Sequence, residues 1–276
     1  MSLVIQTNVA SLQAQKNMSQ SQNMLASSFN RLSSGYRINT AKDDAAGLAI
    51  SESMKNQIRS FTVAERNAND AVSMAQTAEG GLGEISGVLG RMRELAMQGS
   101  NGALQSSDRA YLQTEFSALQ SEIQRIMTST KFNGHQLIAA ASTVLNFQVG
   151  ISNVTTDRIA VTFGKISLTA MLATSTLVSG SAGNSQTSLD RIDTALSEVS
   201  TARARFGAVM NRMDISVANI ESARLNISAA NSRIRDVDVA DETAAMSRNQ
   251  VLMQAGTTIL AQANSSPQQA LSLLRG

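Results

Sequence analysis

The sequence predicts a mainly α-helical protein, a long coiled-coil-like helical rod with an antiparallel bundle and one β-hairpin in the middle. Three observations carry this prediction. Apolar residues recur at alternating steps of three and four over long stretches, the 276 residues include a single proline, and the apolar period changes to two over one short central segment. Steps of three and four place apolar side chains on one face of a helix, whereas a period of two places them on one face of a strand.

The longest periodic stretch runs from Leu189 to Ile234, where thirteen consecutive steps alternate between three and four residues. A helix of this length is roughly 70 Å long at about 1.5 Å per residue, too long to fold wholly inside a compact globule. Three polar residues occupy positions of the apolar seam: Arg203, Arg224 and Asn231. We interpret them as residues that set the helix register or reach the surface.

Two further helices are expected before this one. Residues Met54–Ala96 show the same spacing, with a slip of phase beside Gly80–Gly81, where a bend or a close approach costs little. A shorter helix covers Leu112–Ile126, with Ser107–Asp108 offering oxygens to cap its beginning and Lys131–Gly134 forming a turn after it. Joined by short links, the three helices would bury their apolar seams as an antiparallel bundle.

The central segment reads as a β-hairpin. Apolar residues alternate over 145–149 and again over 159–163, and residues 153–157 have the composition of a turn. Residues 166–186 are small and polar, with Gly180 and Gly183, and predict a loop.

Both ends of the chain are nearly free of charge. Residues 1–30 contain only Lys16 as a charged side chain, and residues 249–274 contain none. Sixteen of the first thirty residues are nonetheless Ser, Thr, Asn or Gln. Solvated helix faces usually carry Glu and Lys, so these helices are expected to be covered by protein on nearly all sides. Heptad spacing persists in both ends, at Val4, Ser11, Met18, Leu25 and Leu32 and at Ala245, Leu252, Ile259, Ser266 and Leu273.

Composition excludes most chemical functions. The chain has no Cys and no Trp, and His135 is its one His, which excludes thiolate chemistry and Cys/His zinc sites and predicts no cofactor. Neither a nucleophile with its base nor a nucleotide-binding loop is present, and we interpret the Asp43–Asp44 pair as stabilising a helix N-terminus. Interleaved charges with a net +2 and 3% aromatics argue against nucleic-acid binding, and no apolar run is long enough to span a membrane.

Several ordered motifs at both ends of the chain resemble bacterial flagellin. In the N-terminal half these are residues 32–50, residues 91–98 and residues 131–134, and in the C-terminal half they are residues 204–212, 232–236 and 253–274. The resemblance covers roughly residues 1–140 and 185–276. The chain is thus similar to a short flagellin that lacks the large outer domains.

The resemblance implies a domain organisation in which the two terminal helices pair. Residues 1–43 and 235–276 would be the halves of an inner domain that lines the filament channel. Residues 44–135 would be the N-terminal rod helices, 187–234 the C-terminal rod helix, and 136–186 the β-hairpin and loop in place of outer domains. Filament assembly is then assigned to seven residues of the inner domain: Val4, Met18, Leu25, Leu32, Leu252, Ile259 and Leu273.

The resemblance also implies partners and a location. The chain would polymerise with itself and would meet the flagellar export apparatus, a flagellin chaperone, the filament cap and hook–filament junction proteins. It would be exported unfolded to the extracellular flagellum, and the absence of Lys, Arg and an apolar run in residues 1–15 predicts no cleavable signal peptide.

An innate immune receptor is one more partner that the resemblance suggests. Arg91, Leu95 and Glu115 are expected to pack in the rod between subunits and to contact such a receptor. Gly90 stands where many detected flagellins have Gln, which predicts weaker recognition. The strongest alternative function is a soluble coiled-coil chaperone or secreted translocator. Such a protein would also be helical and free of Cys, but it would not require uncharged segments at both termini.

Overall fold

The computed structural model describes residues 7–138, 141–164, 166, 168–172, 178 and 180–275, and they confirm a mainly helical chain. Its helices are α1 (Val9–Ser34), α2 (Ala45–Gly99), α3 (Ser106–Ser129), α4 (Thr169–Leu172), α5 (Ala182–Arg235) and α6 (Val239–Arg275). The chain forms two compact units. We call Met1–Asn56 with Asn226–Gly276 the terminal unit and Gln57–Leu225 the central unit.

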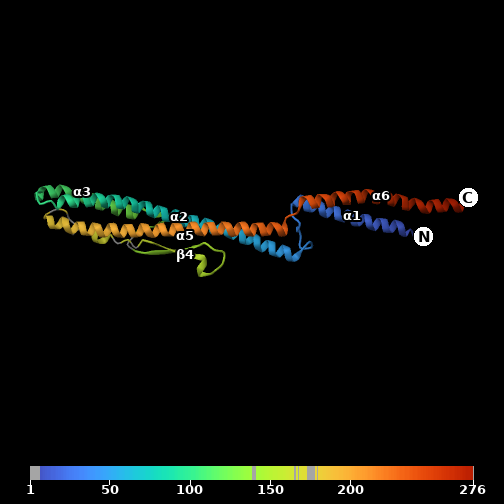
Figure 1. The fold of residues 1–276 in the computed structure, drawn as a ribbon, viewed down its shortest axis with the longest axis horizontal. Coiled ribbons are helices and arrows are strands. Elements are labelled where there is room, and N and C mark those ends of the chain that lie inside the picture. The colour runs from blue at the N-terminus through green and yellow to red at the C-terminus, as the bar shows by residue number, and fades with distance from the viewer. Residues whose placement is uncertain are drawn as a thin grey trace. The chain divides into compact units, whose positions relative to one another are not determined.

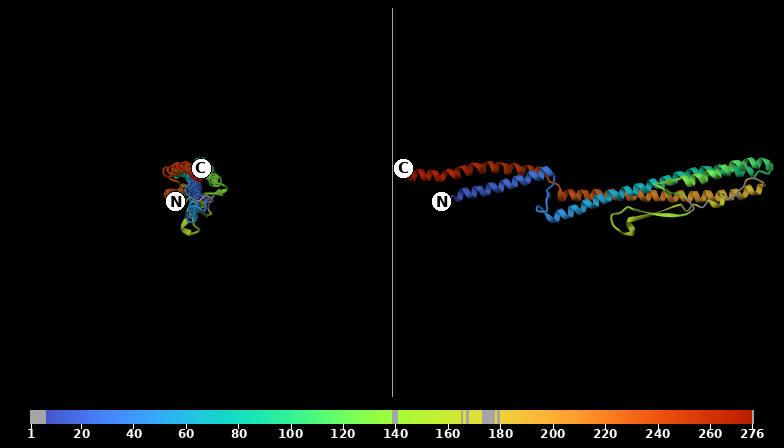
Figure 2. Two further views of the ribbon diagram at one scale, coloured as in Figure 1. Left: turned by 90° about the vertical axis from the view of Figure 1, so that its right-hand side faces the viewer. Right: turned by 180° about the vertical axis from the view of Figure 1, so that it is seen from behind.

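In the central unit, α2, α3 and α5 lie side by side (Figures 1 and 2). Ion pairs show that α2 is antiparallel to α5. Arg93 pairs with Asp193 at 2.7 Å, and at successive points back along α2 the seam residues Arg203 and Arg224 pair with Glu79 and Glu65, each at 2.6 Å. The two arginines that interrupt the apolar seam of α5 therefore form ion pairs with α2 that agree with one antiparallel register.

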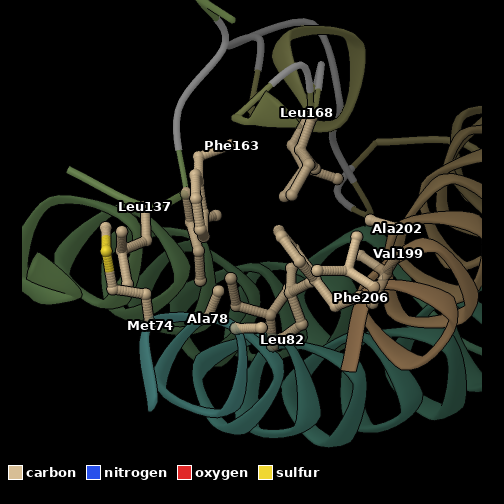
Figure 3. Close-up of a cluster of buried hydrophobic side chains, with 14 of the residues drawn as sticks. Met74, Ala78, Leu82, Leu137, Phe163, Leu168, Val199, Ala202 and Phe206 are labelled. Carbon is tan, nitrogen blue, oxygen red and sulfur yellow. The ribbon is translucent and has the colours of Figure 1, made fainter. Parts of the chain in front are cut away.

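A continuous apolar core fills the central unit. Figure 3 shows how α2, the hairpin and α5 contribute to it, with Leu82, Phe163 and Phe206 among the buried side chains. The rings of Phe163 and Phe206 lie 5.6 Å apart between centroids. Long helices are stable here because each buries one face against its neighbours.

The expected hairpin is formed by β3 (Thr143–Gln148) and β4 (Arg158–Phe163), with Leu145 opposite Val161. A short 3₁₀ turn at Thr155–Asp157 precedes β4. Val161 and Phe163 are buried in the core, which is the alternation that the sequence predicts.

A second, smaller hairpin pairs β1 (Lys131–Phe132) with β2 (His135–Gln136). Asn133 and Gly134 have φ angles of 46° and 81° and so form the tight left-handed turn that an Asn-Gly pair favours. This turn follows α3 within Lys131–Gly134, where the sequence predicts a turn.

At Gly80–Gly81 the structure shows the close approach and not the bend. The helix α2 continues through both glycines without interruption, and a Cβ at Gly81 would lie 2.8 Å from the Cδ1 of Ile138. Ser107 and Asp108 do not cap α3 from outside. The N-cap is Gln105, whose backbone N–H donates to Asp108 in the first turn.

The described residues of the segment 166–186 differ from the expected loop. They include α4 and the first residues of α5, and four of their apolar side chains are buried: Ile166, Leu168, Met171 and Val178. These residues do not follow a helical or strand period, so their burial could not be read from spacing. They cover the core of the central unit where the composition suggested only small polar residues.

In the terminal unit, α1 and α6 run side by side in opposite directions (Figures 1 and 2). Asn8 caps the beginning of α1, and Gly35 ends it with a φ of 73° that only glycine adopts at little cost. The following residues join the start of α6 through a bridge between Tyr36 and Asp236. Among the described residues of this unit, Ile38 is the single buried hydrophobic side chain.

Candidate functional site

The residues with potential chemistry have structural partners. Asp43 accepts hydrogen bonds from the backbone of Asn39 and Thr40, and the backbone N–H of Thr40 lowers the pKa of its carboxyl. Asp44 accepts from the backbone N–H of Gly47 and so stabilises the beginning of α2. Within the described ranges, no group of three His, Cys, Asp or Glu side chains could hold a metal ion, and no helix is long and apolar enough to cross a membrane.

The candidate site is instead a surface, the outward faces of α1 and α6. Large apolar side chains are exposed along both helices, with Phe29 64% and Ile259 59% exposed. The others on these two helices are Val9, Leu12, Met24, Val239, Val251 and Leu252. A set of large exposed apolar side chains on charge-poor helices favours a surface that another protein covers.

The residues assigned to filament assembly divide between two positions in this pair. Met18, Leu25 and Leu32 are half-buried, and Met18 packs over Gly256 of α6. Leu252 and Ile259 are exposed. Val4 lies outside the described residues, and Leu273 belongs to α6 but its side chain is also outside them.

Polar contacts between the two helices were not visible in the sequence. Asn8 Nδ2 donates to the carbonyl of Ala263 at 2.8 Å, and Ser11 Oγ donates to Asn264 Oδ1 at 2.7 Å. At the opposite end of α1, the guanidinium of Arg31 lies 3.6 Å from the carboxylate of Glu242. In the sequence these are ordinary polar residues of a helix, so nothing in the sequence indicated these contacts.

A second surface of interest lies on α2 and α3 of the central unit. Arg91 Nε donates to Glu115 at 2.8 Å, and a further bond joins Arg91 to Glu94 at 2.8 Å. The bond to Glu115 raises the pKa of Arg91. Leu95 is only 1% exposed and packs in the core of its own chain. The structure therefore brings Arg91 and Glu115 together at the surface but not Leu95.

Known proteins resemble the chain along nearly its whole length. Residues 5–143 match the family described as bacterial flagellin N-terminal helical region, and residues 189–274 match the bacterial flagellin C-terminal helical region. A flagellin of Halalkalibacterium halodurans is 42% identical, covering 99% of this chain and all of the relative. A flagellin of Bacillus subtilis is 37% identical, covering 98% and 99%.

One solved structure shows a likeness of fold alone. It is described as a flagellar hook-associated protein from Vibrio parahaemolyticus and is 16% identical, with a TM-score of 0.60. The likeness covers 70% of this chain and all of that one.

Proposed function

The chain belongs to the bacterial flagellin family and is a structural subunit of the extracellular flagellar filament, not an enzyme, and from this premise we propose that its paired terminal helices are the main surface through which copies of the chain pack together. One observation carries the proposal. The helices α1 and α6 leave their large apolar residues exposed, and few charges surround them. Covering these residues with other subunits would remove that apolar area from water.

The proposal extends to the organisation of the subunit. Residues 1–43 and 235–276 form the inner, channel-lining part, residues 44–135 and 187–234 form the rod, and residues 136–186 take the place of outer domains. The exposed Leu252 and Ile259 contact neighbouring subunits directly, whereas the half-buried Met18, Leu25 and Leu32 hold α1 against α6. Val4 and Leu273 extend the same heptad stripes.

The proposed partners beyond the filament follow from family membership. They are the export apparatus, a chaperone, the filament cap and the hook–filament junction proteins. An innate receptor would meet Arg91 and Glu115 on the surface of the central unit, and it would reach Leu95 only if the core beneath them opened.

The substitution Ile259→Asp tests the proposed surface. A carboxylate buried there by a neighbouring subunit would find no opposite charge within residues 249–274 and only Lys16 within residues 1–30, so burial would cost several kcal/mol. Electron microscopy and sedimentation after salt-induced polymerisation should show no filaments, while the thermal midpoint of the central unit stays unchanged.

Gln124→Glu is the matched control. It adds the same charge to an exposed face of α3 that already carries Glu122 and Arg125, and it should polymerise like the parent. Normal filaments from Ile259→Asp would refute the proposed surface, and so would an equal loss of stability in the monomer.

A further inference from the structure

The single proline of the chain lies inside α6, at residue 267. In an α-helix the carbonyl of residue 263 accepts a hydrogen bond from the N–H of residue 267, and proline has no N–H. The carbonyl of Ala263 is therefore without its usual helical donor. A helix interior normally rejects proline for this reason, so the freed carbonyl calls for another partner.

That partner comes from the beginning of α1. Asn8 is the N-cap of α1, and its Oδ1 accepts from the backbone N–H of Ser11 at 3.0 Å. The amide of the same side chain has hydrogens left to donate, and it donates one to the carbonyl of Ala263 at 2.8 Å. Asn8 thus satisfies an orphaned donor of one helix and an orphaned acceptor of the other.

The next turn strengthens the same junction. The buried Ser11 donates through Oγ to the Oδ1 of Asn264, at 2.7 Å. Two side chains of α1 therefore bind two consecutive residues of α6. We define these four residues, Asn8, Ser11, Ala263 and Asn264, as the clasp.

We propose that Pro267 makes the carbonyl of Ala263 a docking point for the beginning of α1, and that the clasp sets the register in which the terminal helices pair. A register device is needed because no large apolar side chain is fully buried between the described parts of α1 and α6. Helices rich in Ala, Ser and Gln slide past one another at little cost. Directional polar bonds at one defined place oppose such slippage, as buried polar residues do in coiled coils.

The remaining contacts of the pair agree with one register. About two turns beyond Ser11 along α1, Met18 packs over Gly256, which lies about two turns before Asn264 along α6. Arg31 reaches Glu242 near the other end. The inference rests on the proposed function only for its consequence, namely that the register decides which exposed apolar residues of α1 lie beside those of α6.

Disulfide trapping reads this register directly, because the chain contains no cysteine of its own. A Cβ at Gly256 would lie 3.8 Å from the Cβ of Met18, which is the mean separation across a disulfide. The full chain with Met18→Cys and Gly256→Cys should oxidise readily to an intramolecular disulfide. The pair Met18→Cys with Leu260→Cys, one helical turn away, should oxidise at least about tenfold more slowly, the ratio that two net hydrogen bonds can maintain.

Breaking the clasp should remove this selectivity. Asn8→Ser keeps an N-cap oxygen but is too short to reach Ala263, and it should bring the two oxidation rates to within about threefold of each other. Pro267→Ala restores the helical donor to Ala263 and should have a similar effect. In the double variant, Asn8→Ser should then change the ratio of the two oxidation rates little further. Asn23→Ser, at an exposed position of α1, is the control and should leave the selectivity intact.

Each outcome is decisive for the clasp. Retained selectivity in Asn8→Ser or in Pro267→Ala would overturn it. If Pro267 merely bends α6, its replacement by Ala would give a stronger helix and leave the register unchanged. Equal oxidation of the two parent pairs would overturn the register itself. The rates are measured both in the soluble chain and in filaments dissolved after oxidation, so a failure of the clasp remains distinct from normal polymerisation of Ile259→Asp, which would refute the proposed surface.

Discussion

The central and terminal units are both built from long antiparallel helices. The central unit buries its large apolar side chains, whereas the terminal unit leaves many of its own exposed. In the central unit the helices and the hairpin close around a core in which Phe206 is fully buried. In the terminal unit Phe29 and Ile259 face outward, and Ile38 is the single buried hydrophobic among its described residues. Helix formation is therefore no measure of how much stability a unit has by itself.

The difference has a physical cause. Most of the stability of a helix in a protein comes from packing its apolar face rather than from helix propensity. The central unit has three long helices, and each finds a partner for its apolar face within the chain. The terminal unit has one pair, which covers one side of each helix and leaves the other sides to a partner. We expect the first to fold alone and the second to be stabilised by assembly.

The two phenylalanines give the largest contrast. Phe206→Ala should lower the free energy of unfolding of the soluble chain by about 3–5 kcal/mol, because it leaves a cavity beside Phe163. Phe29→Ala should lower it by less than about 0.5 kcal/mol, because the ring is already in water. Chemical denaturation followed by circular dichroism measures both. Equal losses would show that the terminal unit has a core of its own.

For filament assembly the order of the two effects should be reversed, with Phe29→Ala having the larger effect. Phe29→Ala should raise the critical concentration for polymerisation by about tenfold or more if neighbouring subunits bury that ring. Sedimentation of filaments at several subunit concentrations gives this value. An unchanged critical concentration would remove Phe29 from the assembly surface.

A smaller effect is expected at the end of the central bundle. Arg109 is 7% exposed, and its guanidinium donates to the carbonyls of Gly99 and Asn101, both at 2.8 Å, and to that of Gly180. Arg109→Met should cost roughly 2–3 kcal/mol, because it removes the guanidinium hydrogen bonds to these carbonyls, of which that of Asn101 keeps a bond from the backbone N–H of Leu104. Arg212→Met, at an exposed position of α5, should cost less than about 0.5 kcal/mol. A similar loss in both would mean that helix propensity, not the buried guanidinium, matters.

The smallest effect concerns acid. Hydrogen bonds from Arg93 and Arg125 lower the pKa values of Asp193 and Glu122 below those of the unfolded chain. A lowered folded-state pKa contributes stability above the unfolded value, about 4, and this contribution is lost as pH falls through the folded value. The thermal midpoint of the central unit should therefore hold down to about pH 5 and decline below about pH 4. Asp193→Asn should make that decline shallower, and an unchanged slope would exclude this ion pair as a cause.

Local periodicity was sufficient to predict the long helices and the hairpin, because each depends on residues close together in sequence. The partners of Arg203 and Arg224 were not predictable, since Glu79 and Glu65 lie 124 and 159 residues away. The segment 166–186 failed as a loop prediction for a related reason. Its large apolar residues follow no single helix or strand period, and only the folded bundle gives the buried ones a core to cover.

The candidate site was predictable as a composition but not as a set of contacts. The absence of charge pointed to Ile259 and Leu252 as residues that another subunit covers, and the structure leaves both exposed. The clasp joins residues more than 250 positions apart, so the sequence did not connect Asn8 with Pro267. Leu95 was grouped with Arg91 by their shared motif, although its side chain is buried in the core of its own chain.

Amide hydrogen exchange before and after polymerisation tests the central claim most directly. In a verified monomer the pair of α1 and α6 should open often, so its amides should be protected far less than those of α2 and α5 in the central unit, which should be protected to the extent of its global stability. In filaments, α1 and α6 should become protected as well. Strong protection of residues 9–34 in the monomer, or none of them gaining protection in the filament, would contradict the claim that the terminal helices are stabilised by neighbouring subunits.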